Sequence, residues 1–221
     1  KNSVVVGNYF DTFARMYYSN PKLTVEEFKK ELAIRKDNKN FSKINIENLF
    51  EESKQRFEEI KEQIKKDLND DNLLFITDEI FVHETFKNGN WDGVAGVLDM
   101  VVIDSKGIVH IYDFKTKSEN NFKYPVTETA LKTAFDSTSI SDEAKWIKQQ
   151  TSYSKMLEKT FGYKPSINII VIPVAYSKEE YKGKLEENEI EKFSPQPYDI
   201  RFAGTKPFLF KLRFDENNKL T

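Results

Sequence analysis

The sequence predicts an α/β fold in which one mixed β-sheet is flanked by helices. The chain opens with segments of helical periodicity, continues with segments rich in β-branched and aromatic residues, and then places one strong helical segment before a further apolar strand. That further strand, 167–176, is an almost continuous apolar run, which is typical of a strand buried on both faces. A helix that crosses between strands joins these elements into a single sheet most economically.

The first third of the chain is predicted to be helical. Residues 4–18 carry apolar side chains at helical spacing, and Pro21 and Thr24 mark a break and a new helix start before residues 25–34. A long charged helix is predicted from 45 to 68. Its apolar stripe consists of Leu49, Phe50, Phe57, Ile60 and Ile64.

The rest of the chain is predicted to alternate between strands, one helix and polar connections. Residues 73–86 are predicted to form one strand, and residues 93–115 two strands around a turn. Ser141 and Gly162 are the expected N-cap and C-terminal stop of a strong helix. The connections 116–140 and 177–197 are polar or charged, and short strands are expected at 199–203 and 208–214.

Composition limits the classes of site that the chain can hold. It has 221 residues, no Cys and two His, which excludes disulfides, cysteine zinc sites and His-rich metal sites. Any metal would be held by oxygen, which favours Mg²⁺, Mn²⁺ or Ca²⁺. The formal charge of −2 gives no overall nucleic-acid signature, so any basic surface must be local. No apolar run is long enough to span a membrane, so a soluble, cytoplasmic protein is expected.

A single domain of 221 residues is predicted, with three parts. The helical N-terminal part covers 1–70, the core 71–176, and a charged excursion with closing strands 177–221. Because the chain begins with Lys1, we expect it to be a piece of a longer protein.

The hairpin within 93–115 contains two aspartates and a lysine in otherwise apolar strands. Gly107 stands third in the loop, which fits a type I turn followed by a left-handed glycine bulge. That register sets Val101 opposite Ile111 and Asp99 opposite Asp113, with Lys115 on the same face. A two-residue loop would instead place the two aspartates on opposite faces.

Two carboxylates held side by side repel each other unless a proton or a cation neutralises them. A divalent metal satisfies both and lowers the pKa of a bound water, while the ammonium of Lys115 can orient that water or neutralise a phosphate. The alternative is a structural ion-pair network without catalysis. An acidic residue two positions before a lysine also recurs elsewhere, as at Glu27 and Lys29, so the strand context carries the functional interpretation.

The chain resembles the PD-(D/E)XK nuclease superfamily, specifically its RecB-like or Cas4-like exonuclease branch. The resemblance rests on a G-x-x-D block at Gly96–Asp99, a D-x-K-T block at Asp113–Thr116, and Q-x-x-x-Y at Gln149 and Tyr153. It implies a restriction-endonuclease-like mixed β-sheet core flanked by α-helices.

The resemblance also implies roles for these residues. Asp99 and Asp113 would bind Mg²⁺ or Mn²⁺, with the backbone carbonyl of Phe114 as a further ligand, and Lys115 would position or activate the attacking water. Gln149 and Tyr153, four apart on one helix face, would contact Lys115 or the phosphate. The alternative for this last pair is a polar helix flank and an ordinary half-buried tyrosine.

The chain departs from the family pattern at the first helix and at the motif glutamine. Asp11 stands where relatives carry a metal-binding His in G-T-x-x-H, so it is carried over as a ligand; its alternative role is an ion pair with Arg15. Gln150 stands where Leu usually follows the motif glutamine, so Gln149 is chosen by spacing. Glu79 is either a supporting acid or an exposed strand residue.

Other conspicuous side chains have plainer explanations. His83 and His110 are interpreted as structural. Trp91 and Trp146 are interpreted as core or partner-facing residues, with base stacking as the alternative. A local phosphate-binding wall and a substrate-facing flap over 116–140 are hypothesised from Lys117, Lys123, Tyr124, Lys132, Lys145 and Lys148.

The sequence therefore predicts a Mg²⁺- or Mn²⁺-dependent deoxyribonuclease, either an exonuclease or a helicase-associated nuclease domain of bacterial or phage origin. DNA is the expected partner, with a helicase or other domains of a larger protein, and no membrane. The alternatives are a nucleic-acid-binding scaffold domain that does not cleave, and a ribonuclease.

Overall fold

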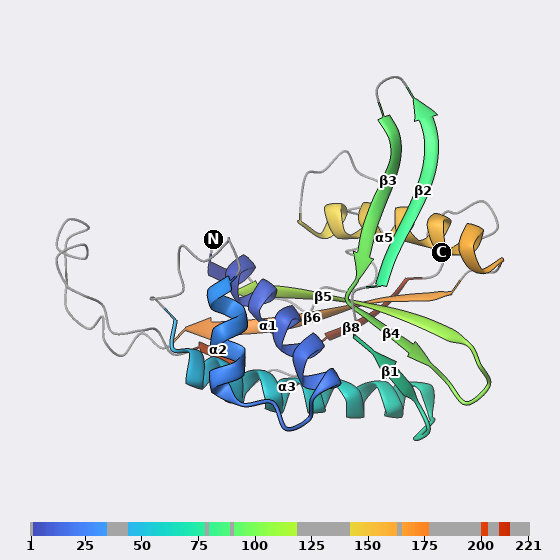
Figure 1. Cartoon of the computed structure of the whole chain (residues 1–221). Coiled ribbons are helices and arrows are strands. Elements are labelled where there is room, and N and C mark those ends of the chain that lie inside the picture. The colour runs from blue at the N-terminus through green and yellow to red at the C-terminus, as the bar shows by residue number, and fades with distance from the viewer. Residues whose placement is uncertain are drawn as a thin grey trace. The chain divides into compact units, whose positions relative to one another are not determined.

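The structure is a computed structural model (Figure 1). It describes residues 2–34, 44–77, 80–88, 91–118, 142–162, 165–176, 200–202 and 208–212. The chain divides into two compact units. The first comprises 1–64, 116–122 and 172–207, and the second 65–115, 123–171 and 208–221. The prediction of a single domain stays a prediction.

The predicted helices of the first third are confirmed as α1 (Asn2–Ser19), α2 (Val25–Ile34) and α3 (Ile46–Leu68). Thr24 begins α2 with a reciprocal cap. Its N–H donates to Glu27 Oε2 at 2.9 Å, and the N–H of Glu27 donates to Thr24 Oγ1 at 3.3 Å. The break after Pro21 is thus fixed by side chains that satisfy the free N–H groups of the new helix.

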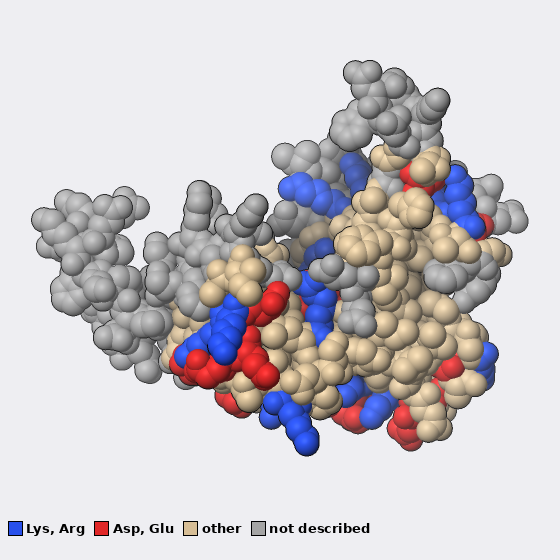
Figure 2. Space-filling model, in the orientation of Figure 1, with Lys and Arg blue, Asp and Glu red and all other residues tan. Residues whose placement is uncertain are grey.

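An aromatic cluster forms the core of the first unit. The ring of Phe13 stacks on Tyr17 at 5.2 Å between centroids and meets Phe28 and Phe50 edge to face at 5.7 and 5.3 Å. The predicted apolar stripe of α3 is buried throughout. Charges of both signs alternate over the exposed helix faces in Figure 2, as expected of solvated surfaces.

The predicted α/β class is confirmed: the core is a mixed β-sheet of six strands. Its strand order is β1-β4-β5-β6-β7, and β8 also pairs with β6. The strands are β1 (Leu74–Ile76), β4 (Met100–Ile103), β5 (Val109–Ser118), β6 (Ser166–Tyr176), β7 (Ile200–Phe202) and β8 (Phe208–Leu212). The closing strands and the buried strand predicted at 167–176 are thereby confirmed.

The prediction of one sheet is wrong in one respect. The segment 73–86 holds two strands, and the apolar run from residue 93 to residue 103 is divided at Asp99. As a result β2 (Ile80–Asn88) and β3 (Trp91–Leu98) form a separate two-stranded sheet. Asp99 stands at the second division, and its carboxylate accepts the N–H of Phe114 there.

The predicted register of the hairpin is confirmed. Val101 pairs with Ile111, and Gly107 has the left-handed φ of 78° that the glycine bulge requires. The turn is closed by the N–H of Gly107 donating to the carbonyl of Asp104 at 2.9 Å. The Asp104 carboxylate reinforces it by accepting the N–H of Lys106 and of Ile108.

The helix predicted to connect the strands is α5 (Asp142–Phe161), the crossover between β5 and β6. It ends at Gly162, whose φ is 73° and whose N–H donates to the carbonyl of Glu158 at 2.9 Å. Within the second unit α5 packs on β2, where Lys159 pairs with Glu84. Among the described residues, none of the helices combines the length and apolarity needed to cross a membrane.

Candidate active site

Asp99 and Asp113 lie together where β3 gives way to β4. The ladder between β4 and β5 ends with Met100 opposite Tyr112, so the next position along carries Asp99 towards Asp113. Asp99 Oδ2 accepts the backbone N–H of Phe114 at 2.7 Å, and Asp99 lies close enough to Asp113 to influence the pKa of that carboxyl group. The two carboxyl groups therefore form a pair anchored to the backbone of β5.

Asp113 is buried, and its Oδ2 lies 2.6 Å from Nζ of Lys115. Burial raises the pKa of the Asp113 carboxyl, while Lys115, Gln150 and Asp99 oppose the rise. Burial also disfavours the charge on Lys115, but the attraction of Asp113 and Asp99 outweighs it and raises the pKa of the lysine. The site thus joins an ammonium whose pKa is raised to a carboxyl group, that of Asp113, whose pKa is also raised.

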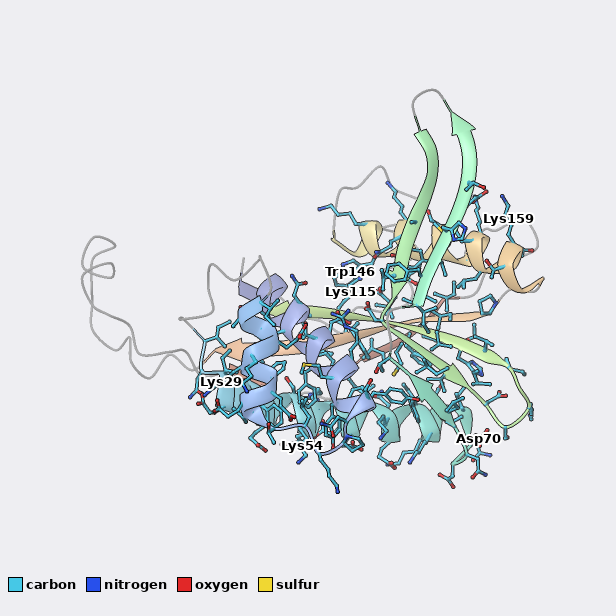
Figure 3. All side chains as sticks on the ribbon, in the orientation of Figure 1. Lys29, Lys54, Asp70, Lys115, Trp146 and Lys159 are labelled. Atoms are coloured by element: carbon cyan, nitrogen blue, oxygen red, sulfur yellow. The ribbon has the colours of Figure 1, made fainter. Side chains whose placement is uncertain are left out.

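Helix α5 contributes a third set of side chains. Tyr153 is buried, and burial raises the pKa of its hydroxyl. Gln149 is exposed on α5 and donates to that hydroxyl at 3.0 Å. The structure thus brings four predicted site residues of the second unit into one neighbourhood, namely Asp99, Asp113, Lys115 and Tyr153. Lys115 on β5 and Trp146 on α5 are marked in Figure 3.

The two glycines of the motif blocks lie where side chains approach the backbone closely. A β-carbon at position 96 would lie 2.7 Å from the hydroxyl oxygen of Tyr153. In the first unit, a β-carbon at position 7 would lie 2.7 Å from Oγ1 of Thr116, the residue that follows Lys115. Neither glycine has a positive φ, so backbone conformation does not require a glycine at these positions. The lack of room for a side chain does.

Sequence reasoning missed Gln150. This side chain is fully buried, and in the described structure neither its amide nitrogen nor its amide oxygen makes a hydrogen bond of normal geometry. It nevertheless lies close enough to Asp113 to lower the pKa of that carboxyl group. The helical spacing of the sequence could have identified Gln150 as an inward-facing residue. Trp146, Gln150, Tyr153 and Leu157 share one face of α5, and the last three of them are buried.

Asp11 lies on α1 in the first unit, one turn after Gly7. Its carboxylate is 3.3 Å from the guanidinium of Arg15, which is the ion pair that sequence reasoning left as the alternative. The metal-binding role of Asp11 stays a prediction.

The two histidines differ in burial: His110 is buried and His83 is exposed. Nε2 of His110, which is buried and opposite Val102 as predicted, lies 3.1 Å from Oδ2 of Asp104 in the turn. Contact with His110 is the main cause that lowers the pKa of Asp104. His83 is exposed on β2. His110 thus has a partner in the hairpin turn.

Several predicted features lie outside the described residues. These are Glu79, the cap Ser141, the excursion 177–197, and most of the hypothesised flap with Lys123, Tyr124 and Lys132, as well as the side chains of Lys117 and Trp91. Of the hypothesised phosphate-binding wall, Lys145 and Lys148 are described, and both are exposed on α5.

The residues at the site fit a divalent cation held by oxygen. No group of three or more His, Cys, Asp or Glu side chains in the described part of the chain could hold a metal. Two adjacent carboxyl groups, however, suit a hard cation completed by water and backbone carbonyls, as Mg²⁺ requires. The unpaired buried amide of Gln150 beside them also calls for a polar occupant.

No family model matches the chain, and no curated protein matches it. Among solved structures, a protein from Eubacterium rectale that bears the name "putative exonuclease" is similar, with a TM-score of 0.42 and 13% sequence identity. The similarity covers 99% of this chain, which spans 60% of the length of that protein.

Proposed function

We propose that the chain is a metal-dependent nuclease of the PD-(D/E)XK type that hydrolyses DNA phosphodiester bonds. The observation that carries the proposal is the cluster of Asp99, Asp113 and Lys115, in which two carboxyl groups and an ammonium meet at a strand break. A purely structural ion pair needs one carboxylate, whereas this site places two beside one lysine.

In this proposal Asp99 and Asp113 hold Mg²⁺ or Mn²⁺, together with the backbone carbonyl of Phe114. Asp11 is proposed as a further ligand; in support, Gly7 lies one turn before it and against the Thr116 side chain. The cation would supply a bound water of lowered pKa and positive charge for the leaving oxygen.

The remaining residues act on charge and position. The Lys115 ammonium, whose pKa is raised, stays protonated at neutral pH and can neutralise a phosphate oxygen or orient the attacking water. The Tyr153 hydroxyl also keeps its proton, so it can donate to a phosphate oxygen while accepting from Gln149. Exposed Lys145 and Lys148 on α5 are proposed contacts of the DNA backbone.

The test is a cleavage assay on linear DNA, circular DNA and RNA with Mg²⁺ or Mn²⁺, and with EDTA as control. Cleavage of linear DNA only would support an exonuclease. Asp71→Asn is the matched control for Asp99→Asn, since Asp71 is exposed in the same unit. If neither the wild type nor the Asp71→Asn control cleaves any substrate, the proposal is contradicted. Cleavage of RNA alone would identify a ribonuclease. The helicase or further domains proposed as partners are tested by adding them to this assay.

A further inference from the structure

Gln150 is a buried polar side chain for which packing gives no reason. It is fully buried in α5, yet its amide nitrogen and oxygen both lack a normal hydrogen bond within the described structure. An unpaired buried amide is costly, and each such group in a native structure needs an explanation. A polar occupant that binds at this position would supply one.

The surroundings of Gln150 identify the chemistry of that occupant. The side chain lies beside the Asp113 carboxyl group, which also faces Asp99 and Lys115. One turn further along the same helix face, Tyr153 is fixed by the close packing of its ring on Gly96. Gln150 therefore stands on a helix that is packed against β3, and its side chain is close enough to Asp113 to influence that carboxyl group.

We propose that Gln150 is a positioning residue, whose amide N–H donates to the Asp113 carboxylate and whose carbonyl oxygen accepts a hydrogen bond from a water on the bound divalent cation. The inference rests on the proposed function, because it requires the cation at Asp99 and Asp113. Ligating carboxylates are commonly held by such outer hydrogen bonds. The amide of Gln150 offers a donor and an acceptor together without adding charge to the cluster.

Gln150→Met separates this role from a structural one. Methionine keeps the volume of the side chain but has no strong donor or acceptor, so the metal-free protein should be as stable as wild type or more stable. The affinity for Mn²⁺ should fall by about tenfold or more, as for other outer-shell losses. Ser154→Ala is the control: its hydroxyl is also buried and unpaired on α5, and its removal should leave Mn²⁺ affinity unchanged.

The experiment measures Mn²⁺ binding to the full chain by calorimetry, with circular dichroism to check folding, for wild type, Gln150→Met and Ser154→Ala. Weaker binding by Gln150→Met alone supports the inference. Equal binding by all three overturns it while leaving the proposed function intact. Failure of the wild type to bind Mn²⁺ overturns the proposed function and the inference with it.

A second measurement on the wild type covers the case in which Gln150→Met does not fold. Glutamine side-chain amides are labelled with ¹⁵N, and Mn²⁺ is added in substoichiometric amounts. The signals of the Gln150 amide, next to the ion, should broaden first. Broadening of no buried glutamine signal would overturn the inference.

Discussion

The ring of Tyr153 lies on the Cα of Gly96, and this contact joins helix α5 to strand β3 within the second unit. A β-carbon at position 96 would lie 2.7 Å from the Tyr153 hydroxyl oxygen, which is closer than β-carbons come to other atoms. The contact explains two separate sequence blocks at once. The glycine of the first block makes room for the tyrosine of the third, and Asp99 follows that glycine by three residues.

Gly96→Ala should therefore displace Tyr153. Overpacking of this kind costs about 1–3 kcal/mol in the free energy of unfolding, and here it also moves a hydroxyl of the candidate site. Urea unfolding and the cleavage assay should both report a loss. Val97→Ala is the control, because Val97 is partly exposed and its truncation should change stability far less. Wild-type stability and cleavage in Gly96→Ala would contradict the proposed role of this contact.

Gly107 should tolerate substitution poorly for a different reason. Nothing lies within 4 Å of a β-carbon at this position, so space is free, but the φ of 78° is one that L-residues avoid. Gly107→Ala should cost about 1–2 kcal/mol, and Gly107→Asn less, because asparagine adopts this conformation more readily. Thermal unfolding of the two variants checks the order. A melting temperature for the alanine variant equal to wild type would show that the turn relaxes.

Local signals made part of the fold predictable. Gly107 fixed the register of the hairpin, and the apolar stripe of α3, as at Phe57 and Ile60, identified a buried helix face. These predictions succeeded because a turn type and a helical period are properties of adjacent residues. The presence of Asp99 and Asp113 in apolar strands indicated the candidate site, whose function stays a prediction.

Features that depend on distant partners were not predictable. The division at Asp99 accompanies a hydrogen bond to Phe114, fifteen residues away, and the local composition predicted one continuous strand. The choice between Gln149 and Gln150 depends on which face of α5 turns towards Asp113, and a motif spacing alone cannot decide it. The metal-binding role of Asp11 stays a prediction, since the structure shows its ion pair with Arg15.

Two substitutions of Asp99 should separate its effect on stability from its effect on cleavage. Asp99→Asn keeps an oxygen that can accept the N–H of Phe114, so the strand break should persist and the protein should remain folded. It removes a charge from the carboxyl pair, so cleavage should fall to the background of the EDTA control. Asp99→Ala should lose cleavage and stability together, by about 1–3 kcal/mol, because the N–H of Phe114 loses this acceptor. Urea unfolding of both variants distinguishes them, and cleavage by Asp99→Asn at the wild-type rate would remove Asp99 from the site.

Asp113 should make the protein less stable to unfolding as the pH rises, whereas most carboxyl groups have the opposite effect. Burial raises the pKa of Asp113, so the folded protein holds this proton more tightly than the unfolded chain does. Its contribution to stability is therefore fully present below the ordinary pKa of an aspartate and is lost as pH rises through the folded-state value.

The expected result is that wild type loses unfolding free energy relative to Asp113→Asn as the pH rises above the ordinary pKa of an aspartate, since asparagine does not titrate. Urea unfolding in EDTA at fixed ionic strength measures this difference. Added Mg²⁺ should reverse the loss in wild type alone, because a cation that binds only the folded, ionised site stabilises it by mass action. A difference between the two proteins that stays constant with pH would show that Asp113 has no raised pKa, and a reversal by Mg²⁺ in both proteins would place the cation elsewhere.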